Sequence, residues 1–325
     1  MSASLKGKVR RVLRWGQGGA GGLRILTLMA RHGTEKYAEA LPRIDEIFRR
    51  RMPGAARRTV VIDNAMPQGQ VEPGPSGVTV IGGDNSAWEF SAWDEGLRFV
   101  GPELDGYDLV HLATSAFDTL YTGYLKRFDD ALLAEVARLR MACGHIDYYD
   151  EPVTFLADVS QHWVRSSFLF LAPTELRRLG SLVSVGPAQR AALFSGDPAA
   201  PFRADAPMSE NYKRYVADWL LGTGTGQGTE WHSRFELTAG TLDFFEQKAI
   251  AIFNEHMLSV RLRAQGCALA DTIWAAATLA RDGRLPTPVP TWRLQLAGRD
   301  RNAVPLEKTA GLDGEGGVTP RSAPP

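Results

Sequence analysis

Two pairs of polar residues that could contact a ligand follow short apolar runs in the first third of the chain. Asp63 and Asn64 end one run, and Asp84 and Asn85 follow a second run that closes on a Gly-Gly pair. Ligands of parallel α/β sheets bind at the carboxyl ends of the strands, so two such pairs favour a binding site. The alternative is that each Asp-Asn pair only turns the chain after a strand. The Gly-Gly pair suits backbone that approaches a ligand or takes a positive φ.

The elements that must position these residues alternate along the chain. Continuous apolar runs predict buried parallel strands at 23–30, 59–62, 78–81 and 107–112. Apolar residues at helical spacing predict helices at 36–51 and 129–141. This alternation is typical of an α/β fold with a doubly wound, mostly parallel sheet flanked by helices. A further helix is expected to pack on the sheet through Trp88, Ala92, Glu95 and Phe99.

Two segments carry a resemblance to a known family. The stretch 81–97, I-G-G-D-N-S-A-W-E-F-S-A-W-D-E-G-L, resembles the N-x-G-x-x-x-A-x-N-x-G-[IL] segment of family 2 glycosyltransferases. The strand end V-V-I-D-N-A looks like the V-x-D-N-[AG]-S strand end of that family. The resemblance implies a GT-A-type fold and a nucleotide-sugar site in which Asp63 and Asp84 read the nucleoside. It also puts Asn64, which shapes a turn, and Asn85 among the donor-binding residues.

A third segment resembles a more specific group within these glycosyltransferases. The run W-V-R-S-S-F-L-F-L at 163–171 is similar to bacterial polysaccharide-assembly glycosyltransferases of the rhamnan-synthesis-protein-F type. The resemblance makes Arg165 a candidate contact for the donor phosphates. The alternative is a structural arginine that pairs with a neighbouring carboxylate.

The segment 248–266, K-A-I-A-I-F-N-E-H-M-L-S-V-R-L-R-A-Q-G, resembles the E-D-x-D-L-x-x-R-x-x-x-x-G segment of the same family. The resemblance puts Glu255 at the position of the catalytic Asp and Arg261 at that of the family arginine, whereas Asn254 replaces the first acidic residue. An inverting transfer needs a base that takes the proton of the acceptor hydroxyl. A carboxylate also favours an oxocarbenium-like transition state. The alternative is an exposed glutamate on a helix that ends at Gly266.

One motif of the family is absent. Its strand corresponding to 107–112 ends in paired Asp residues that hold Mg²⁺ or Mn²⁺, but this chain has Ala113, Thr114 and Ser115 there. The diphosphate charge must still be balanced for the leaving group to depart. We therefore assign no metal ligand and expect Arg165 or Arg261 to balance that charge. There are two alternatives. A Mg²⁺ or Mn²⁺ ion enters with the nucleotide sugar, or the chain has lost the transfer activity.

The segment 142–160 gathers five acidic or histidine residues in a short span. Their order matches no common metal motif, so a solvated acidic loop is favoured over a metal site. The five are His145, Asp147, Asp150, Glu151 and Asp158.

Composition excludes several classes of protein. The chain has 37 Lys+Arg and 37 Asp+Glu, so its charge does not favour binding of nucleic acid. Cys143 and Cys267 stand far apart, as expected of reduced thiols in a cytoplasmic protein. No apolar run reaches the roughly 20 residues that span a bilayer.

The predicted organisation has three parts. Residues 1–22 form a basic leader and linker, which either is solvated or rests on anionic lipid at the inner membrane face. Residues 23–295 form one GT-A-like domain with a nucleotide-binding half, 23–128, and an acceptor-binding half, 129–295. Residues 296–325 form a disordered tail.

The sequence thus predicts a glycosyltransferase. It would move a sugar from a nucleotide-diphosphate donor to a bacterial surface polysaccharide or lipid-linked glycan, with inversion and a carboxylate base. The alternative is a catalytically degenerate, glycosyltransferase-like binding or scaffold protein in polysaccharide assembly.

Overall fold

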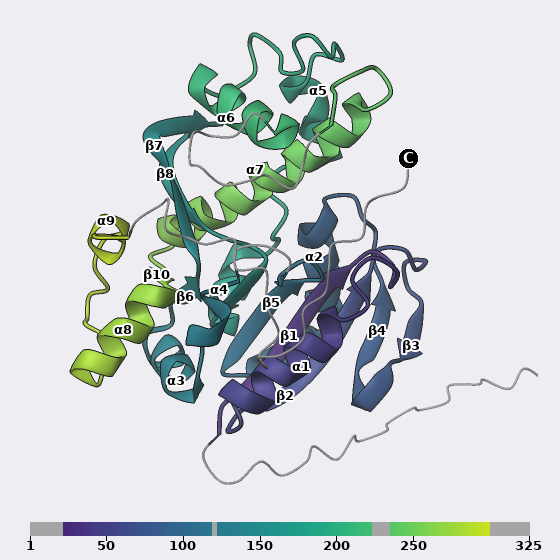
Figure 1. Ribbon diagram of the computed structural model, residues 1–325. Coiled ribbons are helices and arrows are strands. Elements are labelled where there is room, and N and C mark those ends of the chain that lie inside the picture. Colours follow the sequence, from purple (N-terminus) through teal and green to yellow (C-terminus); the bar gives the residue numbers. More distant parts are fainter. Residues whose placement is uncertain (1–21, 119–121, 223–234, 300–325) are drawn as a thin grey trace, which may run out of the picture.

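The computed structural model describes residues 22–118, 122–222 and 235–299, which contain an eight-stranded sheet (Figure 1). The strands of this sheet are β1 (Arg24–Arg31), β2 (Ala56–Asp63), β3 (Val71–Pro73), β4 (Thr79–Gly82), β5 (Leu109–Thr114), β6 (Ala142–Gly144), β9 (Phe168–Leu171) and β10 (Leu269–Asp271). Their order is β10-β6-β9-β5-β1-β2-β4-β3. β9 runs antiparallel to β5 and β6, β3 runs antiparallel to β4, and the other neighbours are parallel.

Helices cover both faces of the sheet. One face packs against α2 (Trp88–Val100), α4 (Pro173–Leu179) and the C-terminal part of α7 (Leu242–Ala264). The other face packs against α1 (Ala40–Arg51), α3 (Asp130–Leu139) and α8 (Thr272–Asp282). Strands buried on both faces read as the continuous apolar runs seen in the sequence. The predicted α/β, doubly wound, mostly parallel sheet is therefore confirmed.

A smaller lobe stands above the sheet (Figure 1). It has its own core, built from a hairpin, two helices and the N-terminal part of α7. The hairpin pairs β7 (Ile146–Phe155) with β8 (Asp158–Val164), and the helices are α5 (Arg190–Leu193) and α6 (Glu210–Leu221). Most of the segment 142–160 lies in β7 and β8, which pair with each other. The prediction of a solvated acidic loop there is therefore wrong.

Short elements connect these parts. They are the 3₁₀ turns η1 (Pro75–Gly77), η2 (Gly101–Gly106), η3 (Leu125–Arg127) and η4 (Pro187–Gln189), and the short helix α9 (Trp292–Gln295). None of the helices in the described ranges is both long and apolar enough to span a bilayer.

Of the predicted face of α2, only Ala92 is buried in the core. Phe90, Trp93 and Gly96 face the sheet, whereas Phe99 is 39% exposed. The Trp93 indole donates to the carbonyls of Leu28 and Ala113 at 3.1 and 3.3 Å, which fixes the rotation of the helix. A Cβ at Gly96 would lie 2.9 Å from the Ile62 side chain, so a glycine there lets the helix approach β2 closely.

Candidate functional site

Asp63 lies at the carboxyl end of β2, as predicted, and its carboxylate already has three donors. Its Oδ1 accepts from the N–H groups of Gly33 and Ala65 at 2.8 and 3.0 Å, and its Oδ2 accepts from Arg31 Nε at 2.7 Å. Burial alone would raise the pKa of Asp63, but these hydrogen bonds outweigh it and hold the pKa below its usual value. Asp63 is therefore an ionised, rigid anchor that orders the loop after β1.

Asn64 joins the two polar pairs that the sequence singled out. Its Nδ2 donates to Asn85 Oδ1 at 2.9 Å and to the carbonyl of Trp88 at 3.2 Å. Asn85 and Trp88 both have a positive φ, 53° and 54°, which is uncommon for Asn and strained for a bulky residue. The loop after β4 is thus held against the end of β2 in an unusual backbone conformation.

The glycines of that loop serve close packing rather than a positive φ. A Cβ at Gly82 would lie 1.9 Å from the Pro67 carbonyl oxygen, and one at Gly83 would lie 2.0 Å from Asn64 Oδ1. Neither glycine has a positive φ, so the predicted positive φ is wrong. The close approach predicted for this backbone occurs, but it is to Pro67 and Asn64 of the same chain.

Asp84 is exposed at the same edge of the sheet, and its carboxylate accepts hydrogen bonds from its own loop. Its Oδ1 accepts from the N–H and the hydroxyl of Ser86, both at 2.9 Å. Burial alone would raise its pKa, but hydrogen bonds from Ser86 and Ser91 lower it overall. Asp84 therefore forms an Asx turn that shapes the loop.

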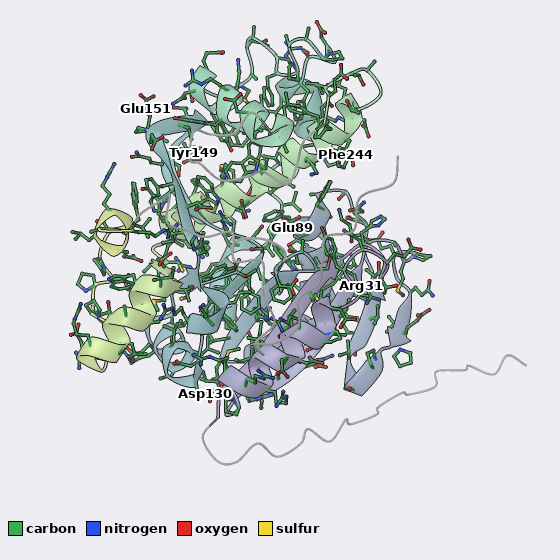
Figure 2. All side chains as sticks on the ribbon, viewed as in Figure 1. Arg31, Glu89, Asp130, Tyr149, Glu151 and Phe244 are labelled. Carbon is green, nitrogen blue, oxygen red and sulfur yellow. The ribbon has the colours of Figure 1, made fainter. Side chains whose placement is uncertain are left out.

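Glu255 projects from α7 and meets Glu89, at the start of α2, through one serine. The Ser166 N–H and hydroxyl lie 2.7 and 2.8 Å from Glu255 Oε1. The same hydroxyl lies 3.1 Å from Glu89 Oε1. Glu89 directly follows Trp88, whose carbonyl accepts from Asn64. The carboxylate pair is therefore next to the strand-end loop that Asn64 holds. In Figure 2, Glu89 lies between Arg31, at the carboxyl end of β1, and Phe244, on α7.

Both glutamates have a pKa above the usual value of a glutamate side chain. Burial raises the pKa of Glu89 to about 7, and the negative charge of Glu255 adds to this effect. Burial also raises the pKa of Glu255, although the Ser166 donors and the Arg165 charge oppose the rise. Titratable pairs with shifted pKa values are typical of sites of proton transfer.

One face of α7 carries further functional groups toward the same edge. The Phe244 ring is 45% exposed and lies 6.3 Å from the ring of Trp88. Lys248 Nζ lies 5.0 Å from the centre of the Phe244 ring. Burial, together with the positive charge of Lys36, lowers the pKa of Lys248. The Phe244 ring therefore lies beside Trp88, with Lys248 next to the ring and Lys36 close enough to act on Lys248.

The two predicted phosphate-binding arginines have protein partners. Arg165 is paired with Asp147, and both side chains are mostly buried. Burial alone would raise the pKa of Asp147, but Arg165, with His145 and Arg299, holds that pKa well below its usual value. Arg261 donates to Ser184 Oγ at 2.9 Å and to the Leu179 carbonyl at 2.7 Å. These contacts give Arg261 a structural role between α7 and the segment after α4.

Arg299, from the segment assigned to the tail, extends the Arg165–Asp147 pair into a buried ion cluster. It donates to Asp271 Oδ2 at 2.9 Å, to the Ile146 carbonyl at 2.8 Å, and contacts His145 Nε2 at 2.9 Å. Residues 296–299 therefore belong to the folded body, whereas 300–325 and the leader 1–21 lie outside the described residues. Of the titratable residues in 142–160, His145 and Asp147 are buried here, which corrects their assignment to a solvated loop.

The end of β5 does not offer the ligands of a chelated metal. Ala113, Thr114 and Ser115 occupy it, and Asp118 lies 4.0 Å from Arg43. Across the described ranges, no three His, Cys, Asp or Glu side chains are grouped so that they could hold a metal ion. The donor set therefore does not fit Mg²⁺ or Mn²⁺ held by the protein alone.

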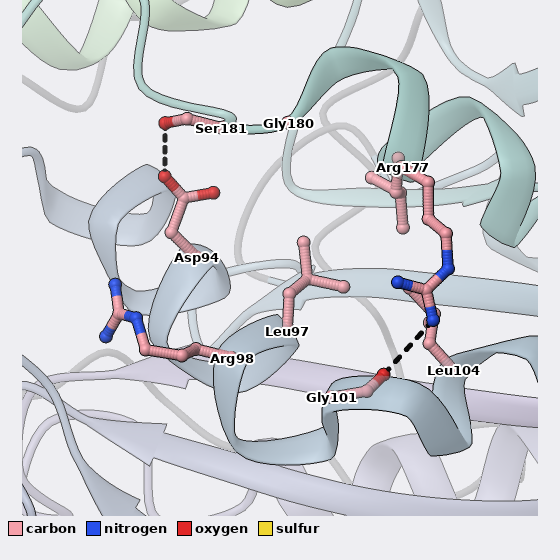
Figure 3. Close-up of a pocket in the computed structure, with 9 residues that line it drawn as sticks. Asp94, Leu97, Arg98, Gly101, Leu104, Arg177, Gly180 and Ser181 are labelled. Atoms are coloured by element: carbon pink, nitrogen blue, oxygen red, sulfur yellow. Dashed lines mark hydrogen bonds between the residues drawn. The ribbon is translucent and has the colours of Figure 1, made fainter.

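A separate hollow of about 560 Å³ lies at the other end of α2 (Figure 3). Leu97 and Leu176 line it together with Arg98 and Arg177, which pair with Glu95 and Asp105. Nine residues of helix, roughly 14 Å, separate Arg98 from Glu89. The hollow is therefore distinct from the carboxylate site.

Glu89, Ser166, Phe244 and Lys248 were not recognised from the sequence as site residues. Two features of the sequence could have indicated Glu89 and Ser166. Glu89 stands in the first turn of the helix that follows a polar loop at a strand end, and Ser166 directly follows Arg165. Phe244 and Lys248 precede Glu255 on one helix, where a single heptad separates Lys248 from Glu255.

Comparison with known proteins leaves the family open. No protein-family model matches the chain, and no curated protein does. Among solved structures, the chain is similar to the mannosyltransferase PcManGT from Pyrobaculum calidifontis in complex with GDP-Man and Mn²⁺. The similarity covers 81% of this chain and 80% of that one, with 11% identity and a TM-score of 0.34. A likeness this weak carries no conclusion about activity or ligands.

Proposed function

We propose that this chain is a glycosyltransferase of GT-A type. It moves a sugar from a nucleotide-diphosphate donor to a growing bacterial surface polysaccharide or a lipid-linked glycan. The observation that supports this proposal is the position of Glu255. Its carboxylate is held by Ser166 next to Glu89, beside the strand-end loops of Asp63 and Asn64. A base with a raised pKa at the ligand-binding edge of a parallel sheet suits proton removal from a hydroxyl.

In the proposed reaction, Glu255 takes the proton of the acceptor hydroxyl while that oxygen bonds to C1 of the donor sugar. The bond from C1 to the diphosphate oxygen breaks, its electron pair leaves with the diphosphate, and the configuration at C1 inverts. Both Ser166 contacts use Glu255 Oε1, so Oε2 is the oxygen that receives the proton. The negative charge nearby also stabilises an oxocarbenium-like transition state.

Cationic side chains balance the leaving diphosphate in this proposal. We assign this role to Lys248, which lies on α7 beside Phe244, and to Lys36, whose charge acts on Lys248 from the loop after β1. Arg165 lowers the pKa of Glu255 through its charge and therefore also acts on the site. No step of the proposed transfer runs through Mg²⁺ or Mn²⁺, because the described residues do not group as ligands for such an ion.

The exposed ring of Phe244, beside Trp88, gives the site an apolar surface against which a sugar ring can pack. We assign this surface to the glycan acceptor. The proposal also puts the protein in the cytoplasm, where nucleotide sugars are made. Contact of the basic leader with an anionic membrane stays a prediction, since residues 1–21 lie outside the described ranges.

A second candidate is a catalytically degenerate binding or scaffold protein in polysaccharide assembly. Two observations favour it. Ala113, Thr114 and Ser115 replace a carboxylate pair at the end of β5, and the carboxylate of Asp63 already has three protein donors. Such a protein would keep the fold and lose the transfer.

Calorimetric titration with a panel of nucleotide sugars, with and without Mn²⁺, separates the two candidates. The enzyme is expected to bind one donor without added metal and to release the nucleoside diphosphate when acceptor is present. Absence of binding to every donor in the panel would favour the scaffold. Metal-dependent binding would contradict the proposed role of Lys36 and Lys248.

A further inference from the structure

The contacts around Ser166 hold more acceptors than the serine hydroxyl can serve. Its single hydrogen faces two carboxylate oxygens, Glu255 Oε1 at 2.8 Å and Glu89 Oε1 at 3.1 Å. If both glutamates were ionised, the hydroxyl could donate to one of them only. The other contact would bring two electron-rich oxygens together in a partly buried site, which costs free energy.

One additional proton resolves this conflict. With a proton on Glu89, that carboxyl donates to Ser166 Oγ, and the Ser166 hydroxyl donates to Glu255. Every contact in the group is then a hydrogen bond. The proton belongs on Glu89 rather than on Glu255, because Glu255 Oε1 also accepts the Ser166 backbone N–H at 2.7 Å. Two donors on one oxygen stabilise the ionised form of Glu255.

We propose that Glu89 and Glu255 share one proton through the Ser166 hydroxyl, with Glu89 neutral and Glu255 ionised in the resting protein. Glu89 is thereby a positioning residue, since it fixes the direction of the Ser166 hydroxyl toward Glu255. The inference rests on the proposed function only in treating Glu255 as the base. The burial of Glu89, which raises its pKa to about 7, agrees with a proton retained there near neutral pH.

The surrounding groups do not titrate in this range. Those that act on Glu89 or Glu255, or are acted on by Glu255, are Arg165, Asp147, Tyr124, Tyr149 and Tyr212. Arg165 stays charged, and Asp147 stays ionised because its pKa is well below the usual value. Burial raises the pKa of all three tyrosines, that of Tyr124 to about 12. Burial lowers the pKa of His256, which follows Glu255, to about 3, so among these groups a proton lost near pH 7 comes from the glutamate pair.

Infrared spectroscopy of the full-length protein, with its glutamate carboxyls labelled with ¹³C, tests the inference without substrate. At about pH 6, below the Glu89 pKa of about 7, we expect the carbonyl band of a protonated glutamate. This band should disappear by about pH 9, two units above that pKa. Glu89→Gln should abolish it, and the exposed control Glu151→Gln should leave it unchanged. A wild-type protein without the band, or a band that persists in Glu89→Gln, overturns the proposal.

Ser166→Ala gives a second reading if Glu89→Gln does not fold. In the proposed arrangement the hydroxyl accepts a hydrogen bond from neutral Glu89 and donates one to Glu255, so its removal destabilises the protonated pair and should move the midpoint of the band to lower pH. An unchanged midpoint contradicts the shared proton. Because the bands report protonation in the free protein, they appear whether or not the chain transfers a sugar. Failure of the proposed function and failure of this inference are thus distinguishable.

Discussion

The backbone N–H of Ser166 donates to Glu255 Oε1 at 2.7 Å, across 89 residues of sequence. Ser166 lies in the loop between β8 and β9, and β9 pairs with β5 in the middle of the sheet. The carboxylate of α7 is therefore positioned by the sheet and not only by its own helix. A glutamate side chain held by a backbone donor has fewer accessible rotamers, which suits a group that must face a reacting atom.

Replacing Glu255 with Gln should abolish transfer and leave folding intact. The amide keeps the size of the side chain but cannot accept a proton, and loss of a general base typically lowers the rate about 10²- to 10⁴-fold. Turnover of the donor that binds in calorimetry measures the effect, and the thermal shift caused by that donor reports binding. Glu151→Gln, on the exposed part of β7, is the matched control. Wild-type turnover in Glu255→Gln would refute the base assignment.

The stability of the wild-type protein should fall as the pH rises from about 4.5 to about 7. Glu89 keeps its proton in the folded state up to about pH 7, whereas an unfolded glutamate releases it near pH 4.5. The folded state therefore binds more protons in this window, and each unit of pKa shift is worth about 1.4 kcal/mol. Because Glu89 is partly exposed, we expect a loss of about 1–3 kcal/mol in the free energy of unfolding from this residue.

Urea denaturation at a series of pH values measures this loss. Glu89→Gln should reduce the slope of the free energy of unfolding against pH between about 4.5 and 7. Glu255 has a raised pKa and contributes a slope of the same sign, which both proteins keep. Curves that run parallel for the wild type and the variant would show that Glu89 titrates normally.

Gly82→Ala should destabilise the protein by about 1–3 kcal/mol, because the new methyl group would lie 1.9 Å from a backbone carbonyl that cannot move freely. Gly83→Ala meets the Asn64 side chain instead, which can turn away at the expense of its contacts with Asn85 and Trp88. We expect a smaller loss of stability and weaker donor binding. Gly240→Ala, with its nearest atom at 3.8 Å, is the control. Equal melting temperatures for Gly82→Ala and Gly240→Ala would contradict this account.

Arg299→Met should lower the free energy of unfolding by about 3 kcal/mol. The substitution removes a cation from Asp271, which is 1% exposed, and from Asp147. Breaking a buried ion pair leaves an uncompensated charge. Arg281→Met removes an exposed pair with Asp282 and should cost much less. Chemical denaturation of both variants compares the two costs, and similar values would show that the buried cluster is not needed.

Lys248→Gln should weaken donor binding about tenfold, which corresponds to about 1.4 kcal/mol. The substitution removes one of the two lysine charges assigned to the diphosphate and keeps most of the length of the side chain. Lys126→Gln, in η3 on the opposite face of the sheet, should leave the affinity unchanged. Calorimetry with the donor at two salt concentrations measures both variants. An affinity of Lys248→Gln that equals the wild type at low salt would remove Lys248 from the proposal.

The sequence predicted the fold well because buried parallel strands have a simple signature. Leu26 and Leu28 in β1 and Val60 and Ile62 in β2 are completely buried, and they appear as continuous apolar runs. The direction of β9 could not be predicted in the same way. The run F-L-F-L is buried throughout, and nothing in its composition distinguishes a parallel from an antiparallel neighbour.

The site was only partly predictable, since its partners are far apart in sequence. The strand-end rule found Asp63 and Asn64, which depend on local geometry. Glu89 and Ser166 meet across 77 residues, and no periodicity reports such a contact. The resemblance made Arg165 and Arg261 candidate phosphate contacts, and it could not show that Arg165 pairs with Asp147 of the hairpin or that Arg261 bonds to Ser184 after α4. Tertiary contacts of this kind decide which charged side chains face a ligand.

The helix α7 belongs to two cores at once. Phe245 and Phe253 pack into the upper lobe, and Leu258 and Leu262 pack against the sheet. A rigid rod shared by both bodies resists their swinging apart, so we expect the lobes to melt together in a single transition. Glu255 stands where this helix passes from one core to the other, so its position relative to the sheet is set when the chain folds. In the proposed reaction the base is therefore in place before a substrate arrives, and no closing movement of the two lobes has to bring it there.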